Sequence, residues 1–182
     1  MGRGPLAGPV VAAAVILVPG ARLPGVDDSK RVPRAARGEL AVLIRAAARS
    51  HALAAVDVQA IDRLNIREAT FVAMRKALGA LEVTPDLVLV DGFAIPGLLL
   101  RQEPVIGGDR KSLSIAAASI LAKVHRDALM DEYHHLYPEY GFDRHRGYGT
   151  AEHLAALRRH GPCPIHRRSF APAALAVQLA CL

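Results

Sequence analysis

The stretch from Val88 to Lys123, VLVDGFAIPGLLLRQEPVIGGDRKSLSIAAASILAK, decides the fold that we expect for this chain. It holds two short apolar runs, and a glycine and a carboxylate follow each run: Asp91 comes after the first and Asp109 after the second. Short apolar runs bounded by glycines are typical of buried strands, which can be parallel and covered on both faces. A long helical pattern then begins at Ile115. The stretch therefore predicts an α/β fold with both aspartates at or just past strand ends.

Asp91 and Asp109 are the candidate metal ligands. Open α/β sheets usually place their chemistry beyond the carboxyl ends of strands. Carboxylate oxygens suit Mg²⁺ and Mn²⁺, and Asp109 lies just before a helix N-terminus, where negative charge is favoured. A plain structural interpretation stays open on spacing alone, in which Asp91 starts a turn and Asp109 caps a helix.

Length and charge set broad limits. With 182 residues and 52% hydrophobic content, the chain is long enough to bury a substantial core. We expect residues 1–182 to form a single domain, with a loop-and-helix part over residues 138–182. The formal charge of +6 points modestly to a polyanionic partner, although charge alone does not decide this.

Cysteine usage and hydropathy bear on the compartment. The two cysteines, Cys163 and Cys181, lack metal-ligand spacing and favour a reducing, cytoplasmic compartment. No apolar run reaches the roughly 18 residues that a membrane span needs. The apolar segment Leu6–Val18 is preceded only by Arg3 and followed by no typical cleavage site, so we do not interpret it as a signal peptide. We expect a monomer without a membrane partner.

Strand and helix patterns extend over most of the chain. Their order predicts an α/β sandwich around a mixed sheet. The first expected strand has no convincing partner upstream, because the chain begins in a loop rich in glycine and proline. The expected elements are strands at Val10–Val18 and Leu53–Val58, helices from Pro33, from an Asp62 N-cap to Leu81, from Ile115 to Tyr137 and from a Thr150 N-cap to Arg159.

Several motifs, taken together and in order, resemble the ribonuclease HII family, which cleaves the RNA strand of RNA–DNA hybrids. The resemblance implies a ribonuclease-H-like mixed sheet flanked by helices, with further helices at the C-terminal end. It also implies an endonuclease that uses two divalent ions, Mn²⁺ or Mg²⁺, and accepts single ribonucleotides embedded in duplex DNA. The matching stretches are Gly2–Ala14, Asp28–Lys30, Ile61–Ile66, Leu87–Gly92, Gly108–Ser112, Ile115–Lys123, Tyr140–Thr150 and Gly161–Phe170.

The chain departs from the family pattern at its start. In the family, an acidic pair and one small residue precede the glycine-arginine-glycine loop and end the central strand of the sheet. Here Met1 stands in place of the small residue, so the resemblance leaves only the counterparts of the third and fourth carboxylates, Asp91 and Asp109. A start codon read too late and a genuine truncated product both explain this, and we favour the first. With two acids alone, we expect the 182-residue chain to cleave weakly or not at all.

The resemblance also assigns substrate contacts. The backbone of Gly2, Arg3 and Gly4 is expected to contact the ribonucleotide, and Tyr148 to read the junction between ribose and deoxyribose. The alternative for Tyr148 is a turn tyrosine packed on the following helix. The candidate phosphate contacts, each of which is alternatively a solvated surface charge, are Lys111, Arg144, Arg146, Arg167 and Arg168; Asp28–Lys30 has either a substrate or a plain loop role.

Two other functions stay open at this point. The first is a non-catalytic remnant that binds RNA–DNA hybrids. The second is a related nuclease of the same general fold with another specificity. We expect His145 and His166 to be structural or to face phosphate, and Cys163 to be packed rather than reactive.

Overall fold

The computed structural model describes residues 1–26, 32–171 and 173. The chain divides into two compact units. The first unit contains Met1, Val11–Ala54 and Phe71–Val124, and the second contains Gly2–Val10, Ala55–Thr70 and the residues from His125 onward. The single-domain organisation stays a prediction, and the predictions for Asp28–Lys30 and Cys181 fall outside the described residues.

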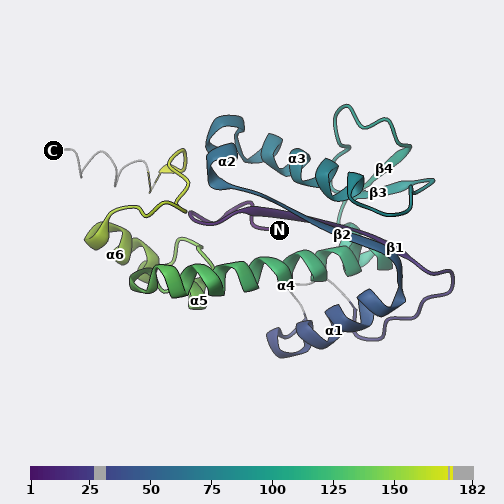
Figure 1. The fold of residues 1–182 in the computed structure, drawn as a ribbon, viewed down its shortest axis with the longest axis horizontal. Helices are drawn as coiled ribbons and strands as arrows, with labels where there is room; N and C mark the ends of the chain where they lie inside the picture. The colour runs from purple at the N-terminus through teal and green to yellow at the C-terminus, as the bar shows by residue number, and fades with distance from the viewer. Residues whose placement is uncertain (27–31, 172, 174–182) are drawn as a thin grey trace. The chain divides into compact units, whose positions relative to one another are not determined.

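Four strands and several helices make up the described chain (Figure 1). Their order of strand, helix, strand, helices, two strands and further helices matches the expected α/β class. The elements are β1 (Val10–Leu17), α1 (Arg34–Ala47), β2 (Ala48–Val56), α2 (Val58–Leu64), α3 (Ile66–Gly79), β3 (Val88–Asp91), β4 (Gln102–Val105), the 3₁₀ turn η1 (Gly108–Arg110), α4 (Leu113–Leu136), the 3₁₀ turn η2 (Pro138–Tyr140), α5 (Phe142–His145) and α6 (Ala151–His160).

The strands form two pairs. β1 pairs with β2, and β3 pairs in parallel with β4, with Val88 opposite Gln102 and Asp91 opposite Val105. The parallel pair confirms the direction expected for these two strands. β3 is covered on one face only, because Val88 and Val90 are buried while Leu89 is exposed. The buried face packs on Phe71 and the side chains near it.

The first strand finds its partners in two places. β1 pairs with β2, which follows it in the chain. On the upstream side, the Val11 N–H donates to the Met1 carbonyl at 3.0 Å, and the Met1 amino group donates to the Val11 carbonyl at 2.6 Å. Met1 therefore bonds to β1 through both of its backbone groups.

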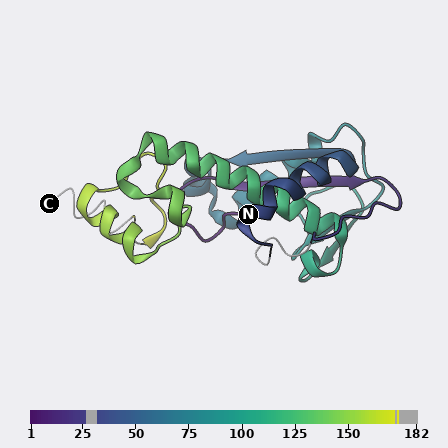
Figure 2. The ribbon, with the colours of Figure 1, turned by 90° about the horizontal axis from the view of Figure 1, so that it is seen from below.

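The core of the first unit lies between α1, the part of α4 up to Val124, and β1 (Figures 1 and 2). The apolar stripe expected on α1 consists of Leu40, Leu43, Ile44 and Ala47; Leu40, Ile44 and Ala47 face this core, whereas Leu43 is exposed. α4 contributes Ile120 and Leu121. Ile44, Ile120 and Leu121 are fully buried. This packing explains why the alanine-rich start of α4 suits its place, since small side chains let neighbouring helices approach closely.

The predicted N-cap at Asp62 is wrong. Asp62 lies inside α2, whose cap is Asp57, and the Asp57 side chain accepts the Ala60 N–H at 2.8 Å. Asn65 then separates α2 from α3, because its φ of 68° is left-handed and its side chain accepts the Arg67 N–H at 2.9 Å. Asn adopts this conformation more readily than most residues, so the expected helix begins at Ile66, and α2 before it is a separate helix that the sequence did not predict.

The core of the second unit is aromatic. The rings of Tyr140 and Phe142 stack with centroids 5.3 Å apart, and Met130 and Ile165 pack in the same cluster. Cys163 is buried there, and burial raises the pKa of its thiol to about 11. The burial confirms that Cys163 is packed, and because the thiolate is the reactive form, the raised pKa disfavours reaction of this thiol.

In the part of the chain that the structure describes, no helix combines the length and the apolar content that crossing a membrane requires.

The core of the first unit makes a direct prediction. Ile120→Ala removes most of a fully buried side chain, and we expect it to lower the free energy of unfolding by about 2–5 kcal/mol. Ile120→Val should cost about 0.5–1.5 kcal/mol. Leu99→Ala is the matched control, because Leu99 is fully exposed and its loss should change stability by less than about 0.5 kcal/mol. Urea denaturation followed by circular dichroism measures all three, and equal midpoints for Ile120→Ala and Leu99→Ala would contradict this core.

Candidate functional site

The two predicted acids lie at one end of the parallel pair β3–β4. Asp91 is the last residue of β3 and is exposed, and Asp109 is half-buried in η1, which follows β4. The Gly108 N–H donates to Asp91 Oδ1 at 3.1 Å. The Gly92 N–H donates to the Val105 carbonyl at 3.0 Å and continues the strand pairing past Asp91. The backbone next to Asp109 is thus bonded directly to the carboxylate of Asp91.

Two glycines shape the turn that carries Asp109. Gly107 has a left-handed φ of 64°, which favours glycine. A Cβ on Gly108 would lie 2.5 Å from Ile115 Cδ1, so this position has no room for a side chain. The absence of a side chain at Gly108 lets the turn pack against the start of α4. Lys111, at the end of the turn, remains exposed.

The acids fit a hard divalent cation by the chemistry of their donors, because carboxylate oxygens are the ligands that Mg²⁺ and Mn²⁺ prefer. The set is small. Across residues 1–26 and 32–171, no three His, Cys, Asp or Glu side chains converge to hold a metal ion. Asp91 and Asp109 could therefore hold a cation only together with oxygens from water, phosphate or another carboxylate.

The glycine-arginine loop belongs to the second unit. Two buried arginines, Arg126 and Arg167, donate to its carbonyl groups. Gly2 has a left-handed φ of 81°, and a Cβ there would collide with the side chain of Arg126. A residue other than glycine at this position would displace either the loop or the guanidinium.

Tyr148 lies beside this loop. Its side chain is 46% exposed, and a Cβ on Gly4 would lie 3.8 Å from Tyr148 Cε1. The Leu6 N–H donates to the Gly147 carbonyl at 2.8 Å, which joins the loop to the segment that carries the tyrosine. A Cβ on Gly147 would lie 2.5 Å from the Ala7 carbonyl oxygen, so this close approach also requires glycine. The structure therefore brings Tyr148 and Gly4 together.

The candidate phosphate contacts have different surroundings. Arg144 is exposed and pairs with Glu152, and Arg146 is 6% exposed and pairs with Asp131. Their contacts with phosphate stay predictions, as does that of the exposed Lys111. Arg167 differs from the expectation, because it is fully buried and its guanidinium is bonded to backbone carbonyls.

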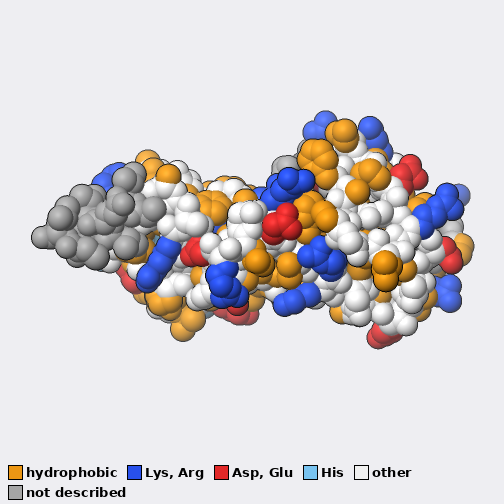
Figure 3. Space-filling view, turned by 90° about the horizontal axis from the view of Figure 1, so that it is seen from above, with side chains coloured by type: hydrophobic (Ala, Val, Ile, Leu, Met, Phe, Trp, Pro, Cys, Tyr) orange, Lys and Arg blue, Asp and Glu red, His pale blue; other side chains and the backbone are white. Residues whose placement is uncertain are grey.

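Surface charge does not mark a nucleic-acid site by itself. On the face drawn in Figure 3, the Lys and Arg side chains form several separate groups and not one continuous patch. The net positive charge is thus compatible with a polyanionic partner but does not locate it.

A chain of hydrogen bonds in the second unit fixes His153 and His166 in their neutral forms. The Cys163 N–H donates to His166 Nδ1 at 2.9 Å, so His166 carries its proton on Nε2. His166 Nε2 lies 3.0 Å from His153 Nε2, which must then accept, and His153 Nδ1 donates to the Tyr148 carbonyl at 2.9 Å. The chain ends on the backbone of Tyr148 and holds that residue in place.

Burial keeps these rings uncharged. Desolvation, with the neighbouring His153, lowers the pKa of His166 to about 4, and desolvation also lowers the pKa of His153. His145 is also buried, and its Nε2 contacts the Tyr140 carbonyl at 2.7 Å. Of the two roles expected for His145 and His166, the structural one agrees with their burial.

Comparison with known proteins gives the family. The sequence profile described as Ribonuclease HII matches residues 1–173. The chain is 54% identical over 171 residues to Ribonuclease HII 1 of Methylibium petroleiphilum, which covers 94% of this chain and 86% of that protein. It is 51% identical over 169 residues to Ribonuclease HII of Caldanaerobacter subterraneus, with 93% and 70% covered.

The chain belongs to the ribonuclease HII family. By class it is an endoribonuclease with ribonuclease H activity. The fold agrees: ribonuclease H2 from Pyrococcus horikoshii superposes with a TM-score of 0.83 at 26% identity, covering 98% of this chain and 94% of that one. Bst-RNase HIII in complex with Mn²⁺ has the same fold, with a TM-score of 0.68 at 20% identity and coverage of 99% and 68%.

The buried, hydrogen-bonded position of Arg126 in this ribonuclease HII chain was not predicted from the sequence. A signal was present, because Ala122, Arg126 and Met130 follow one another at four-residue spacing on one face of α4. Ala122 and Met130 are buried, so the arginine between them has to be buried as well. A charged residue on an apolar stripe indicates a polar partner inside the fold.

The sequence also did not predict that Asp62 binds the backbone of residues 168 and 169. Its carboxylate accepts the Arg168 N–H at 3.0 Å and both the N–H and the hydroxyl of Ser169, the latter at 2.6 Å. Nothing in the local sequence pairs residues more than a hundred positions apart. These contacts hold the segment that immediately follows Arg167.

The neutral histidine chain predicts acid sensitivity. The pKa of His166 is about 4 in the folded state against 6.5 as its ordinary value, so the unfolded state binds more protons between these values. We expect stability to fall as the pH drops from about 6.5 to about 4, by roughly 3 kcal/mol at most from this group. His166→Gln should flatten the pH dependence of the denaturation midpoint, whereas Gln at the exposed His160 should leave it unchanged. Parallel pH profiles for all three proteins would refute the assignment.

Proposed function

We propose that this chain is built to hydrolyse the RNA strand of RNA–DNA hybrids, including single ribonucleotides embedded in duplex DNA. The observation that carries the proposal is the bond from the Gly108 N–H to Asp91, which joins two acidic positions at the carboxyl end of β3–β4. In a ribonuclease HII family member, this is the place where open α/β folds put their chemistry.

Asp91 and Asp109 are the proposed metal ligands and catalytic residues. A divalent ion, Mn²⁺ or Mg²⁺, would supply an activated water and stabilise the charge on the leaving oxygen. Asp91 presents an exposed carboxylate while one of its oxygens accepts the Gly108 N–H. That bond restricts the rotation of the side chain and so presents the carboxylate in one orientation. Bst-RNase HIII, which shares the fold, has been solved with Mn²⁺.

Recognition of RNA depends on the 2′-hydroxyl group, which separates RNA from DNA at a single nucleotide. We assign it to the backbone of Gly2, Arg3 and Gly4 together with Tyr148. The loop and the tyrosine lie beside each other, and the Tyr148 ring is partly exposed. A phenol ring offers a surface for stacking and a hydroxyl for hydrogen bonding. Lys111, Arg144 and Arg146 are the proposed phosphate contacts.

A second candidate is a protein that binds hybrids without cutting them. The observation in its favour is the small number of acids, since the described residues bring no third carboxylate, histidine or cysteine to the pair. Because both candidates predict little cleavage by the 182-residue chain, the assay that separates them uses a chain to which the acidic strand has been added. The cytoplasmic location and the monomeric state stay predictions.

The number of carboxylates predicts the activity of the 182-residue chain. We expect little cleavage of a duplex containing one ribonucleotide in Mg²⁺ or Mn²⁺, because two acids bind the cations weakly. A version extended upstream of Met1 by a strand that ends in aspartate, glutamate and one small residue should cleave. In that version, Asp91→Asn and Asp109→Asn should each lower the rate by about 100-fold or more, which corresponds to roughly 3 kcal/mol.

The control for this experiment is Asp86→Asn, since Asp86 is exposed and lies outside β3 and η1. Its rate should equal that of the extended version. Robust metal-dependent cleavage by the 182-residue chain would contradict the expected weak activity. Full activity of either Asn variant would contradict the ligand assignment.

Tyr148→Phe tests whether Tyr148 contributes to recognition of the ribonucleotide. The change removes one hydroxyl and keeps the ring, so we expect the preference for a ribonucleotide-containing duplex over all-DNA duplex to fall by about two- to tenfold. Competition binding followed by fluorescence anisotropy measures the preference. Tyr137→Phe, at a half-buried position on the turn after α4, is the matched control. Unchanged discrimination in Tyr148→Phe would leave Tyr148 as a packed turn residue only.

A further inference from the structure

Two guanidinium groups are buried in the second unit without an acidic partner. Arg126 is 2% exposed and Arg167 is 0% exposed. Among the residues that the structure describes, neither forms an ion pair with an aspartate or a glutamate. Burying a cation unpaired costs several kcal/mol, so such an arrangement needs a dense set of hydrogen bonds to persist.

Backbone carbonyl groups supply those bonds, and most of them come from the loop Gly2–Pro9. Arg167 donates from Nη2 to Gly2 at 2.6 Å and from Nη1 to Arg3 at 3.1 Å. Its remaining bonds reach the carbonyls of Gly8, at 3.0 and 2.8 Å, and of Pro9, at 3.3 Å. One planar guanidinium thus binds both ends of the loop.

Arg126 holds the returning part of the same loop. It donates to the carbonyls of Ala7 and Pro9, each at 3.0 Å, and to that of Arg146 at 3.0 Å. Only arginine offers five N–H donors in a rigid plane, and lysine has a single ammonium group that cannot span these acceptors. Burial, with the nearby Arg126, lowers the pKa of Arg167 to about 9, so Arg167 keeps its charge and its donors at neutral pH.

Peptide planarity converts these bonds into an orientation of the loop. No described peptide bond is cis, so each carbonyl points opposite to the N–H of the following residue. Because the Gly2 and Arg3 carbonyls point at Arg167, the N–H groups of Arg3 and Gly4 point away from it. Arg3 and Gly4 are exposed, and within the described residues neither of these N–H groups has a hydrogen-bond acceptor. Two successive donors are therefore free to bind a ligand oxygen beside Tyr148.

We propose that Arg126 and Arg167 are positioning residues for substrate recognition, with Arg167 directing the Arg3 and Gly4 amide donors at the ribonucleotide. The inference rests on the proposed function, which assigns the ribonucleotide to this loop. The ligand chemistry is that of an oxygen acceptor on the sugar–phosphate backbone, and selectivity for RNA requires that the 2′-hydroxyl be among the acceptors. The arginines touch no substrate themselves.

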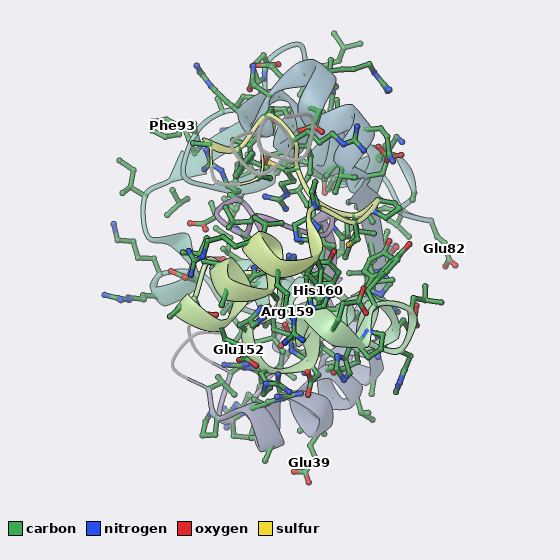
Figure 4. The ribbon with its side chains drawn as sticks, turned by 90° about the vertical axis from the view of Figure 1, so that its left-hand side faces the viewer. Glu39, Glu82, Phe93, Glu152, Arg159 and His160 are labelled. Atoms are coloured by element: carbon green, nitrogen blue, oxygen red, sulfur yellow. The ribbon has the colours of Figure 1, made fainter. Side chains whose placement is uncertain are left out.

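The test compares binding of two labelled duplexes of the same sequence, one with a single ribonucleotide and one entirely DNA, by fluorescence anisotropy without metal. For Arg167→Lys we expect the ratio of the two affinities to fall by about fivefold or more, since two amide donors lose their direction. Arg126→Lys should reduce the ratio less. Arg159→Lys is the matched control, because Arg159 is exposed in the last turn of α6 (Figure 4).

The ratio separates positioning from stability. A variant that is merely destabilised loses folded protein and weakens both affinities equally, which leaves the ratio unchanged. Circular dichroism melting establishes that each variant is folded at the assay temperature. If the unsubstituted chain discriminates and Arg167→Lys keeps the full ratio, the inference is overturned and the proposed function stands. If the unsubstituted chain does not discriminate, the proposed substrate class is overturned as well.

A second measurement needs no substitution. In ¹⁵N NMR spectra of the unsubstituted chain, the amide signals of Arg3 and Gly4 should shift on addition of the ribonucleotide-containing duplex and shift less with the DNA duplex. Amide signals that stay in place with both duplexes would overturn the assignment of these donors. This result holds even if Arg167→Lys fails to fold.

Discussion

The bonds from the guanidinium of Arg167 to the loop Gly2–Pro9 are the constraint on which the second unit depends. They satisfy a buried cation with carbonyl groups alone and tie together backbone that the loop would otherwise leave free. The same bonds decide which backbone groups of the loop remain available, because a trans peptide cannot point its carbonyl and its N–H in one direction. The Arg167 side chain thus both stabilises the loop and determines which N–H groups of the loop can bind a ligand.

The two acids, Asp91 and Asp109, are positioned by backbone contacts and not by a buried side chain. Asp91 and Asp109 are arranged by backbone, through the parallel pairing of β3 with β4 and the Gly108 N–H that reaches Asp91. Gly108 acts by the absence of a side chain, since Ile115 fills the space that a Cβ would need, and Gly107 supplies the left-handed backbone conformation before it. In both places, therefore, main-chain geometry presents the chemistry.

The buried histidines show how easily a residue type misleads. His166 has the ring that a general base needs, yet it lies in a neutral chain of hydrogen bonds that ends on the Tyr148 carbonyl. Desolvation keeps it uncharged well below neutral pH. Its contribution is to hold the backbone of the tyrosine, and only the surroundings of the ring distinguish this from catalysis.

The sequence by itself determined the class of fold, most of the helices and strands, the two acids and the family. These follow from local patterns: apolar periodicity, glycine punctuation and short motifs in a set order. Tertiary structure decided what depends on contacts between distant residues. It moved the start of one expected helix from Asp62 to Ile66 and placed a separate helix, α2, before Asn65. It also buried Arg167 and used the Asp62 carboxylate to bind the backbone that follows this arginine. The physical reason is that burial and hydrogen-bond partners are properties of the packed chain, and side-chain charge alone does not reveal them.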